Sequence, residues 1–385
     1  MLANMTLTPR TLMLTMAVFA LQPIAFGGWL APIPLVKEQL GLNKAELAVA
    51  LLGLPVATVI SLQVASRLIP KIGPRKILAV MFPLQAPVLL LPLFARSQSE
   101  LFLALMGFGV VMAFMQVCLN VYAGRLEKET GAHIMNRCHG FWAIGLMVGS
   151  LAIAALLWAG PVTALFALGI TTGIMGVFCA LALPQLAAEA IKTNPPRRSI
   201  AEMPRMLFLI SLVTFAVSMT EGAMADWGAV YMAERLPIGS SYIGIGVSIY
   251  AGALAFGRLL GDTLKTRFGA MRLARMTFAT ALTGVLLLVL PLPLYVALFG
   301  FACVGIGASV GFPLGVSAAA SLDDGYESAN IAVMSSIGIS GFLLGPPMIG
   351  FLAEAFTLRI GLAALIPGLV IAAVFARCLE TRKTG

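Results

Sequence analysis

The chain contains 385 residues, of which 60% are hydrophobic and only 11% are charged. Soluble globular domains contain about 25% charged residues, so this composition excludes a soluble protein and predicts an integral membrane protein. The net charge of +9 raises nucleic-acid binding as a function, but the distribution of the basic residues, described below, explains it by membrane topology.

Apolar segments recur along the whole chain, and each is long enough for the ~20-residue helix that crosses a bilayer. The expected spans cover residues 11–36, 45–69, 77–95, 101–124, 136–158, 162–183, 206–232, 241–264, 273–291, 294–320, 328–354 and 358–378. The predicted fold class is therefore an all-α membrane protein with twelve transmembrane helices. The first span is too long, and too interrupted by glycine and proline, for a signal peptide, so we expect it to be retained.

The chain divides into two similar halves. The longest polar stretch, from Pro184 to Pro204, is rich in proline and charge and is typical of a linker. At an offset of about 196 residues, Gly73 matches Gly269, Gly145 and Gly149 match Gly341 and Gly345, and Gly28-Trp29 matches Asp226-Trp227 with a two-residue slip. We therefore expect a six-helix bundle at 1–184, a cytoplasmic linker at 185–204 and a second six-helix bundle at 205–385.

The Lys and Arg residues are unevenly divided between the two sides of the membrane. With the N-terminus inside, all basic residues fall on the inner side except Lys37, Lys44, Arg96, Arg235 and Arg359. This asymmetry follows the positive-inside rule and predicts an inner-membrane protein with both termini in the cytoplasm. The net charge thus needs no nucleic-acid partner, and the five cysteines lack the spacing of a disulfide framework or metal site.

Two loops carry a recognisable pattern of small, acidic and basic residues. The first contains Lys71, Gly73, Arg75 and Lys76, and the second contains Arg258, Gly261, Asp262, Arg267 and Gly269. Both resemble the signature loop of the major facilitator superfamily, although Ser66 replaces the first glycine and Pro70 stands at the acidic position. The resemblance implies a transporter of two pseudo-symmetric bundles that acts as a monomer, and within the superfamily the chain resembles the branch that includes fucose permease.

Two acidic residues in span seven are the candidate coupling groups. Glu221 lies about 22 Å from the inner end of the helix and Asp226 about 30 Å, with a rotation of about 140° between them. A carboxylate in hydrocarbon is costly and indicates function. We expect Glu221 to carry a proton, or alternatively to be a structural group bonded to Ser218, Thr220 or a facing helix. Asp226 is a second coupling candidate or an outer gate residue.

Neutral polar and aromatic residues are candidates for the substrate cavity: Gln22, Trp29, Gln116, Asn120 and Trp227. Prolines and glycines beside Gln22 free backbone groups for a ligand or permit close helix packing. The two tryptophans suit stacking on a sugar or, alternatively, an interfacial aromatic belt. Neutral amides favour a polyhydroxylated or other neutral polar solute over a dianion, which would need an embedded base.

A second polar group is expected at the inner ends of the spans. Asn120, Asn136 and His139 lie at similar depth and predict an inner gate, or alternatively a hydrogen-bonded interfacial histidine. The loop that contains Asp324 is acidic, whereas the other inner loops are basic, so we expect a salt-bridge latch between this loop and inner bases such as Arg125, Lys128 or Arg137. The alternative is a solvated turn.

Together these features predict a secondary transporter, not an enzyme, which moves a small polar solute by alternating access and is coupled to protons. The chain has no phosphate-binding G-x-x-x-x-G-K-[ST] loop, and no cofactor is expected. The alternatives are efflux of drugs or metabolites by proton antiport, and a sensor that has the same fold but does not transport. The expected partners are the solute, protons and the lipid bilayer.

Overall fold

The computed structural model describes residues 7–132, 134–186, 203–237, 240–322 and 327–380. Most of the expected linker therefore lies outside the described residues. The α-helices are α1 (Pro9–Leu30), α2 (Ile33–Gln39), α3 (Lys44–Leu51), α4 (Gly53–Ile72), α5 (Pro74–Leu90), α6 (Gln98–Thr130), α7 (Met135–Leu156), α8 (Pro161–Ala182), α9 (Arg205–Ala233), α10 (Ile245–Phe268), α11 (Ala270–Val289), α12 (Leu294–Ala308), α13 (Gly311–Ala320), α14 (Glu327–Ala355), α15 (Leu358–Ala363) and α16 (Leu365–Phe375). Short 3-10 helices are η1 (Leu91–Phe94), η2 (Leu157–Ala159), η4 (Ser241–Gly244) and η5 (Ala376–Leu379).

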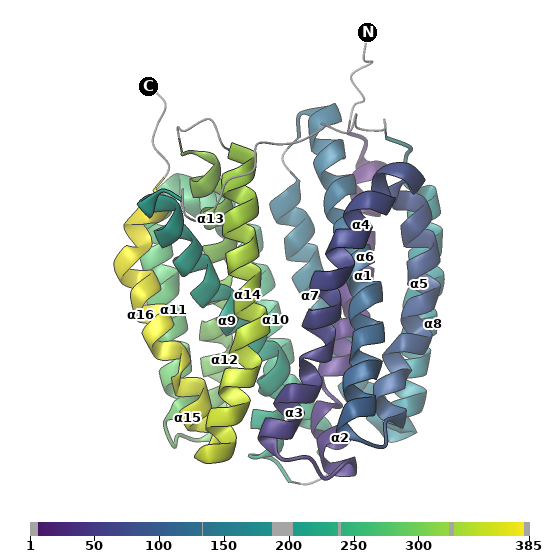
Figure 1. Ribbon diagram of the computed structural model, residues 1–385, viewed down its shortest axis with the longest axis vertical. Helices are drawn as coiled ribbons and strands as arrows, with labels where there is room; N and C mark the ends of the chain where they lie inside the picture. Colours follow the sequence, from purple (N-terminus) through teal and green to yellow (C-terminus); the bar gives the residue numbers. More distant parts are fainter. Residues whose placement is uncertain (1–6, 133, 187–202, 238–239, 323–326, 381–385) are drawn as a thin grey trace. The chain divides into compact units, whose positions relative to one another are not determined.

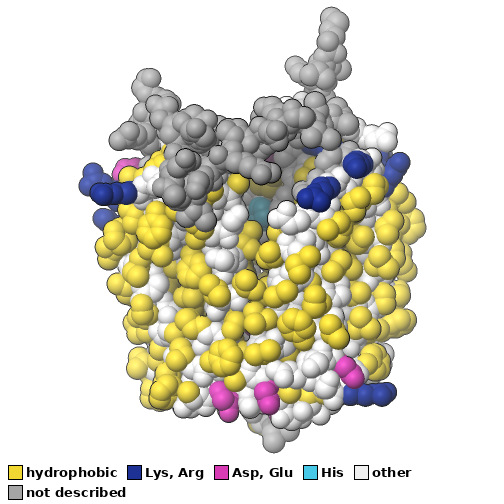
Figure 2. Space-filling model, viewed as in Figure 1, with side chains coloured by type: hydrophobic (Ala, Val, Ile, Leu, Met, Phe, Trp, Pro, Cys, Tyr) yellow, Lys and Arg dark blue, Asp and Glu magenta, His cyan; other side chains and the backbone are white. Residues whose placement is uncertain are grey.

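The predicted membrane spans are confirmed (Figure 1). Among the described residues, 12 helical segments are long and apolar enough to cross a membrane, from Pro9–Gln39 to Leu358–Leu379. Four of these spans combine consecutive α-helices, as α1 and α2 do in the first. Figure 2 shows hydrophobic side chains over the middle of the visible faces and charged side chains near the ends. Such apolar faces suit contact with lipid.

Local sequence signals explain where several helices begin and end. Asn43 and Glu46 form a capping box, in which each side chain accepts a hydrogen bond from the other residue's backbone N–H. Gly73 and Gly269, which the repeat pairs, have φ values of 90° and 79° and separate consecutive helices in each half. A side chain would be strained there, so glycine produces the turn.

By their contacts the residues form two compact units, one of residues 1–191 with 229–251 and the other of 192–228 with 252–385. The end of α9 and the start of α10 thus group with the first unit. Within that unit Ser150 Oγ donates to the Gly244 carbonyl at 3.0 Å, and Lys44 Nζ lies 2.7 Å from Glu234 Oε1. The predicted division into six-helix bundles at 1–184 and 205–385 remains a prediction.

The repeated glycines lie at equivalent helix contacts in the two halves, between α1 and α7 and between α9 and α14. A Cβ on Gly145 or Gly149 of α7 would lie 2.0 Å or 1.9 Å from a carbonyl oxygen of α1. A Cβ on Gly341 or Gly345 of α14 would lie 2.4 Å or 3.0 Å from a carbonyl oxygen of α9. Such small residues allow membrane helices to approach backbone to backbone. The helices that carry the candidate residues, α1 and α9, are therefore held closely in place.

Replacing Gly149 with alanine should destabilise the first unit, because the new methyl group would push α7 away from Ile24 on α1. Overpacking of this kind costs roughly 1–3 kcal/mol. Gly124→Ala is the matched control, since its Cβ would meet nothing within 4 Å. Thermal unfolding of both purified variants tests this. Equal melting temperatures for the two variants would contradict the proposed close contact.

Candidate functional site

A buried ion pair joins α9 and α10 within the second unit. Arg258 Nη2 on α10 donates to both carboxylate oxygens of Glu221 on α9, at 2.9 Å and 3.1 Å. The Arg258 side chain is 10% exposed and the Glu221 side chain 9%. Burial of two charges requires this kind of mutual satisfaction, because an isolated charge would lose its hydration without compensation. Glu221 thus has a partner on a facing helix, which was one of the two expectations.

The position of Arg258 corrects the sequence-based assignment. Arg258 was expected at the inner end of its span as part of a signature loop, whereas it lies ten residues before Phe268, the last residue of α10. At 1.5 Å per residue this is about 15 Å from the helix end. Only the later residues of the second signature loop, Arg267 and Gly269, lie at the end of the helix. Span eight therefore contains a base whose side chain is only 10% exposed, and also Asp262, which is exposed.

Asp226 differs from Glu221 in that it has no partner among the described residues. Its side chain is partly buried in α9, and no hydrogen bond or ion pair joins it to another described group. The next residue, Trp227, is fully buried, and its indole N–H donates to the Pro346 carbonyl of α14 at 3.0 Å. This bond fixes the segment of α9 beside Asp226. The two acidic residues are thus chemically distinct, one paired and one unpaired.

In the first unit, Gln22 lies at the centre of a buried polar cluster. Its Oε1 accepts from the Trp142 indole N–H at 2.9 Å, and its backbone carbonyl accepts from Gln85 Nε2 at 2.7 Å. Gln22 Nε2 donates to the Met112 sulfur at 2.8 Å. Because an indole only donates and a carbonyl only accepts, these bonds fix the orientation of both amides. Gln85 Oε1 is buried and has no partner among the described residues.

The other cavity candidates are dispersed. Trp29 is 2% exposed and Trp227 is 0% exposed, so neither forms the lipid-facing aromatic belt that was one alternative. Gln116 and Asn120 are partly buried on α6, and Asn120 Oδ1 has no partner among the described residues.

Sequence reasoning missed Trp142, although its position close to the inner half of span five, on the same helix as Gly145, was a usable signal. It contacts Phe26, with 6.5 Å between ring centroids.

The expected inner-gate residues lie at the start of α7. Asn136 and His139 are partly buried, and the His139 ring packs edge-on against Phe19 at 6.0 Å. Arg137 is exposed. Asp324, its expected partner, lies outside the described residues. Glu127 Oε1 of α6 accepts from the backbone N–H groups of Ile134 and Met135, so an acidic residue caps the N-terminus of α7.

The two signature loops make different contacts. Arg75 in the first donates to the Ala180 and Leu181 carbonyls at the end of α8, while Lys71 and Lys76 are exposed. In the second, the Arg267 guanidinium lies 5.4 Å from the Phe268 ring centroid. Gly261 of α10 faces Val310, between α12 and α13.

The described part of the chain contains no cluster of metal-ligating side chains, and the cysteines within it are unbonded thiols.

Comparison with known proteins gives consistent matches. The family profile described as Major Facilitator Superfamily matches residues 11–326. An uncharacterised transporter of Sinorhizobium fredii, y4wD, is 32% identical over 93% of this chain and 94% of its own length. An uncharacterised MFS-type transporter of Yersinia pestis is 28% identical over 95% of this chain and 94% of its own length.

The chain is also similar in fold to solved transporter structures. The nucleoside transporter NupG, as its D323A mutant, superposes with a TM-score of 0.76 over 96% of this chain and 99% of that chain, at 12% identity. A bacterial homologue of the human lysosomal transporter Spinster, in an inward-facing and unoccupied conformation, gives 0.71 over 97% and 98%, at 15% identity. At these identities the likeness concerns the fold.

Proposed function

The chain belongs to the major facilitator superfamily, and from that premise we propose that it moves a small polar solute across the inner membrane in symport or exchange with protons. Both termini are cytoplasmic in this proposal, and the two bundles give alternating access to a central site. The observation that carries proton coupling is the set of charges in the membrane part of the second unit. Among them are the Glu221–Arg258 ion pair and Asp226, which has no hydrogen-bond or ion-pair partner among the described residues.

The charges of Glu221 and Arg258 balance each other, whereas Asp226 has no described counter-ion. An unbalanced charge inside hydrocarbon is strongly unfavourable and is usually removed by protonation or by binding of an opposite charge. Asp226 is therefore the group that exchanges protons in this proposal. Glu221 is held by Arg258 and acts as a positioning residue that keeps α9 and α10 together.

The first unit supports a neutral polar solute as the substrate class. Its hydrogen-bonded cluster joins the buried amides of Gln22 and Gln85 and the partly buried indole of Trp142, and these hydrogen bonds involve no described base. Gln85 Oε1 and Asn120 Oδ1 are acceptors without a partner among the described residues, so they would accept from hydroxyl or amine groups. A neutral solute also needs no counter-ion from the protein, so Asp226 of the second unit stays available for the proton.

The test is uptake of solute into liposomes that contain the purified protein, without a proton gradient and with one in each direction, because symport uses an inward gradient and exchange an outward one. Solutes are first chosen by a thermal-shift screen of sugars, polyols, nucleosides, amino acids, organic acids and drugs. A neutral polar solute that stabilises the protein and accumulates only with the gradient is the expected result. Flux that ignores the gradient would contradict proton coupling, and stabilisation with no flux would favour a sensor.

The predicted latch between Arg137 and Asp324 gives a separate test of gating. Reversing either charge alone should slow transport, because like charges would then face each other across the closed inner gate. Exchanging the two charges, as Arg137→Asp with Asp324→Arg, should restore the rate. Initial uptake rates in liposomes measure this. A double variant as slow as the single variants would contradict the pairing.

A further inference from the structure

A cavity of about 860 Å³ lies at one end of the second unit, on the side where the helices meet the chain's C-terminus. The start of α9, the junction of α10 and α11, and the end of α16 with η5 form its walls. All described lining residues belong to a single unit, and none takes part in the proton coupling proposed above. In the proposed topology this end faces the cytoplasm.

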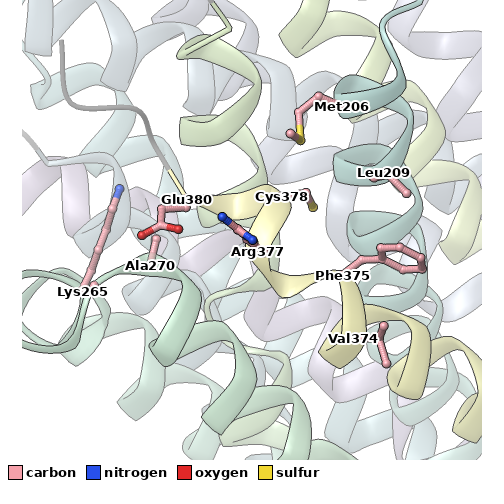
Figure 3. A pocket seen from close by; sticks show the side chains of 10 residues that line it. Met206, Leu209, Lys265, Ala270, Val374, Phe375, Arg377, Cys378 and Glu380 are labelled. Carbon is pink, nitrogen blue, oxygen red and sulfur yellow. The ribbon is translucent and has the colours of Figure 1, made fainter.

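One side of the cavity is charged. Lys265 and Arg377 contribute two positive charges and Glu380 one negative charge, and Figure 3 shows Glu380 between Lys265 at the left and Arg377 near the centre of the view. Neither base forms an ion pair with a described residue. Gly269 precedes the first turn of α11 and offers no side-chain cap, so the adjoining backbone N–H groups add to the positive potential. The described lining carries a net positive charge.

The other side of the cavity is apolar and opens outward. Val374 is 62% exposed, Phe375 39% and Met206 47%. Figure 3 shows Val374, Phe375 and Leu209 together, away from Lys265 and Glu380. Arg377 and Glu380 are three and six residues beyond Val374, so the charged groups lie about 5–9 Å nearer the end of the helix. The cavity thus has a charged rim above an exposed apolar wall.

This order of charge and apolar surface matches one occupant. We propose that the cavity binds the headgroup of an anionic phospholipid of the inner leaflet, with the phosphodiester on Lys265 and Arg377 and an acyl chain along Val374 and Phe375. Basic pockets at the cytoplasmic ends of transmembrane helices suit lipid phosphates. Glu380 favours a head that bears hydroxyl donors, and a single negative charge on the lipid would neutralise the described lining. Phosphatidylglycerol meets both conditions.

The experiment is native mass spectrometry of the delipidated full chain with phosphatidylglycerol, phosphatidylethanolamine or phosphatidylcholine in mixed micelles. Phosphatidylglycerol should bind most tightly to the wild type. Lys265→Gln with Arg377→Gln should weaken that binding about 30-fold, as expected for the loss of two bases near a phosphate. Lys265→Arg should retain it. The matched control, Arg10→Gln with Arg67→Gln, removes two exposed bases outside the cavity and should retain it as well.

Three results would overturn the proposal. The first is equal binding of the three lipids, which would mean that only the apolar wall is recognised. The second is an equal loss of binding in the cavity variant and the control, which would mean that any two surface bases suffice. The third is binding of inorganic phosphate alone as tight as that of phosphatidylglycerol, which would make the cavity a site for the free anion. Size-exclusion profiles of the variants confirm that each is folded before comparison.

Discussion

Glu221→Gln should lower the free energy of unfolding by roughly 3–5 kcal/mol, because it leaves the Arg258 guanidinium buried without a counter-ion. The amide of glutamine can still accept one hydrogen bond, but it carries no charge. Replacing both residues with glutamine should recover most of the lost stability, since no unpaired charge then remains in the second unit's α9–α10 contact. Thermal unfolding in detergent measures the three variants against the wild type.

The chain supplies its own control for this prediction. Lys44 and Glu234 form an ion pair at 2.7 Å, but their side chains are 22% and 42% exposed. Exposed pairs contribute about 0–1 kcal/mol, so Glu234→Gln should change stability little. Similar losses for Glu221→Gln and Glu234→Gln would show that burial does not govern the α9–α10 pair. A double variant less stable than Glu221→Gln alone would also contradict the interpretation.

The pair shows why sequence reasoning found one partner and missed the other. Glu221 is conspicuous because an acidic residue inside a long apolar segment is rare and usually functional. Arg258 lies in a segment rich in bases and glycines, and the motif assigned all of them to the helix end. In the structure α10 continues to Phe268, which leaves Arg258 well inside the helix. Gly269, which the internal repeat pairs with Gly73, was the available signal for that helix end. Which face of each helix meets the other depends on packing, and the helical spacing of one span alone does not specify it.

The fold itself could be predicted almost completely. Span ends follow from local chemistry, as the capping box at Asn43 and the glycine turns at Gly73 and Gly269 show. The internal repeat paired glycines that prove to hold equivalent helices together. Long-range side-chain contacts were less accessible. Gln22 was identified as a candidate, but its bonds to Trp142 and Gln85 join residues 120 and 63 positions away.

Asp226, which has no partner among the described residues, leads to the prediction with the largest effect on transport. Under a pH difference of two units, a carrier that moves one proton with a neutral solute can concentrate it about 100-fold, since each unit is worth about 1.4 kcal/mol. Asp226→Asn should reduce this accumulation to about onefold, because the amide cannot exchange a proton. Exchange of labelled for unlabelled solute should persist, since that reaction needs no net proton movement.

The comparison of Asp226 with Glu221 decides where the coupling proton resides. If Arg258 holds Glu221 as a fixed counter-ion, the doubly substituted Glu221→Gln, Arg258→Gln protein should still accumulate solute with the gradient. Glu38→Gln, which makes the same chemical change at an exposed position, is the matched control and should behave as the wild type. Accumulation by the Asp226→Asn protein, together with its loss in the double variant, would instead assign the proton to the Glu221–Arg258 pair. Because exchange and accumulation are measured on the same liposomes, a variant that merely misfolds would lose both and would be recognised as such.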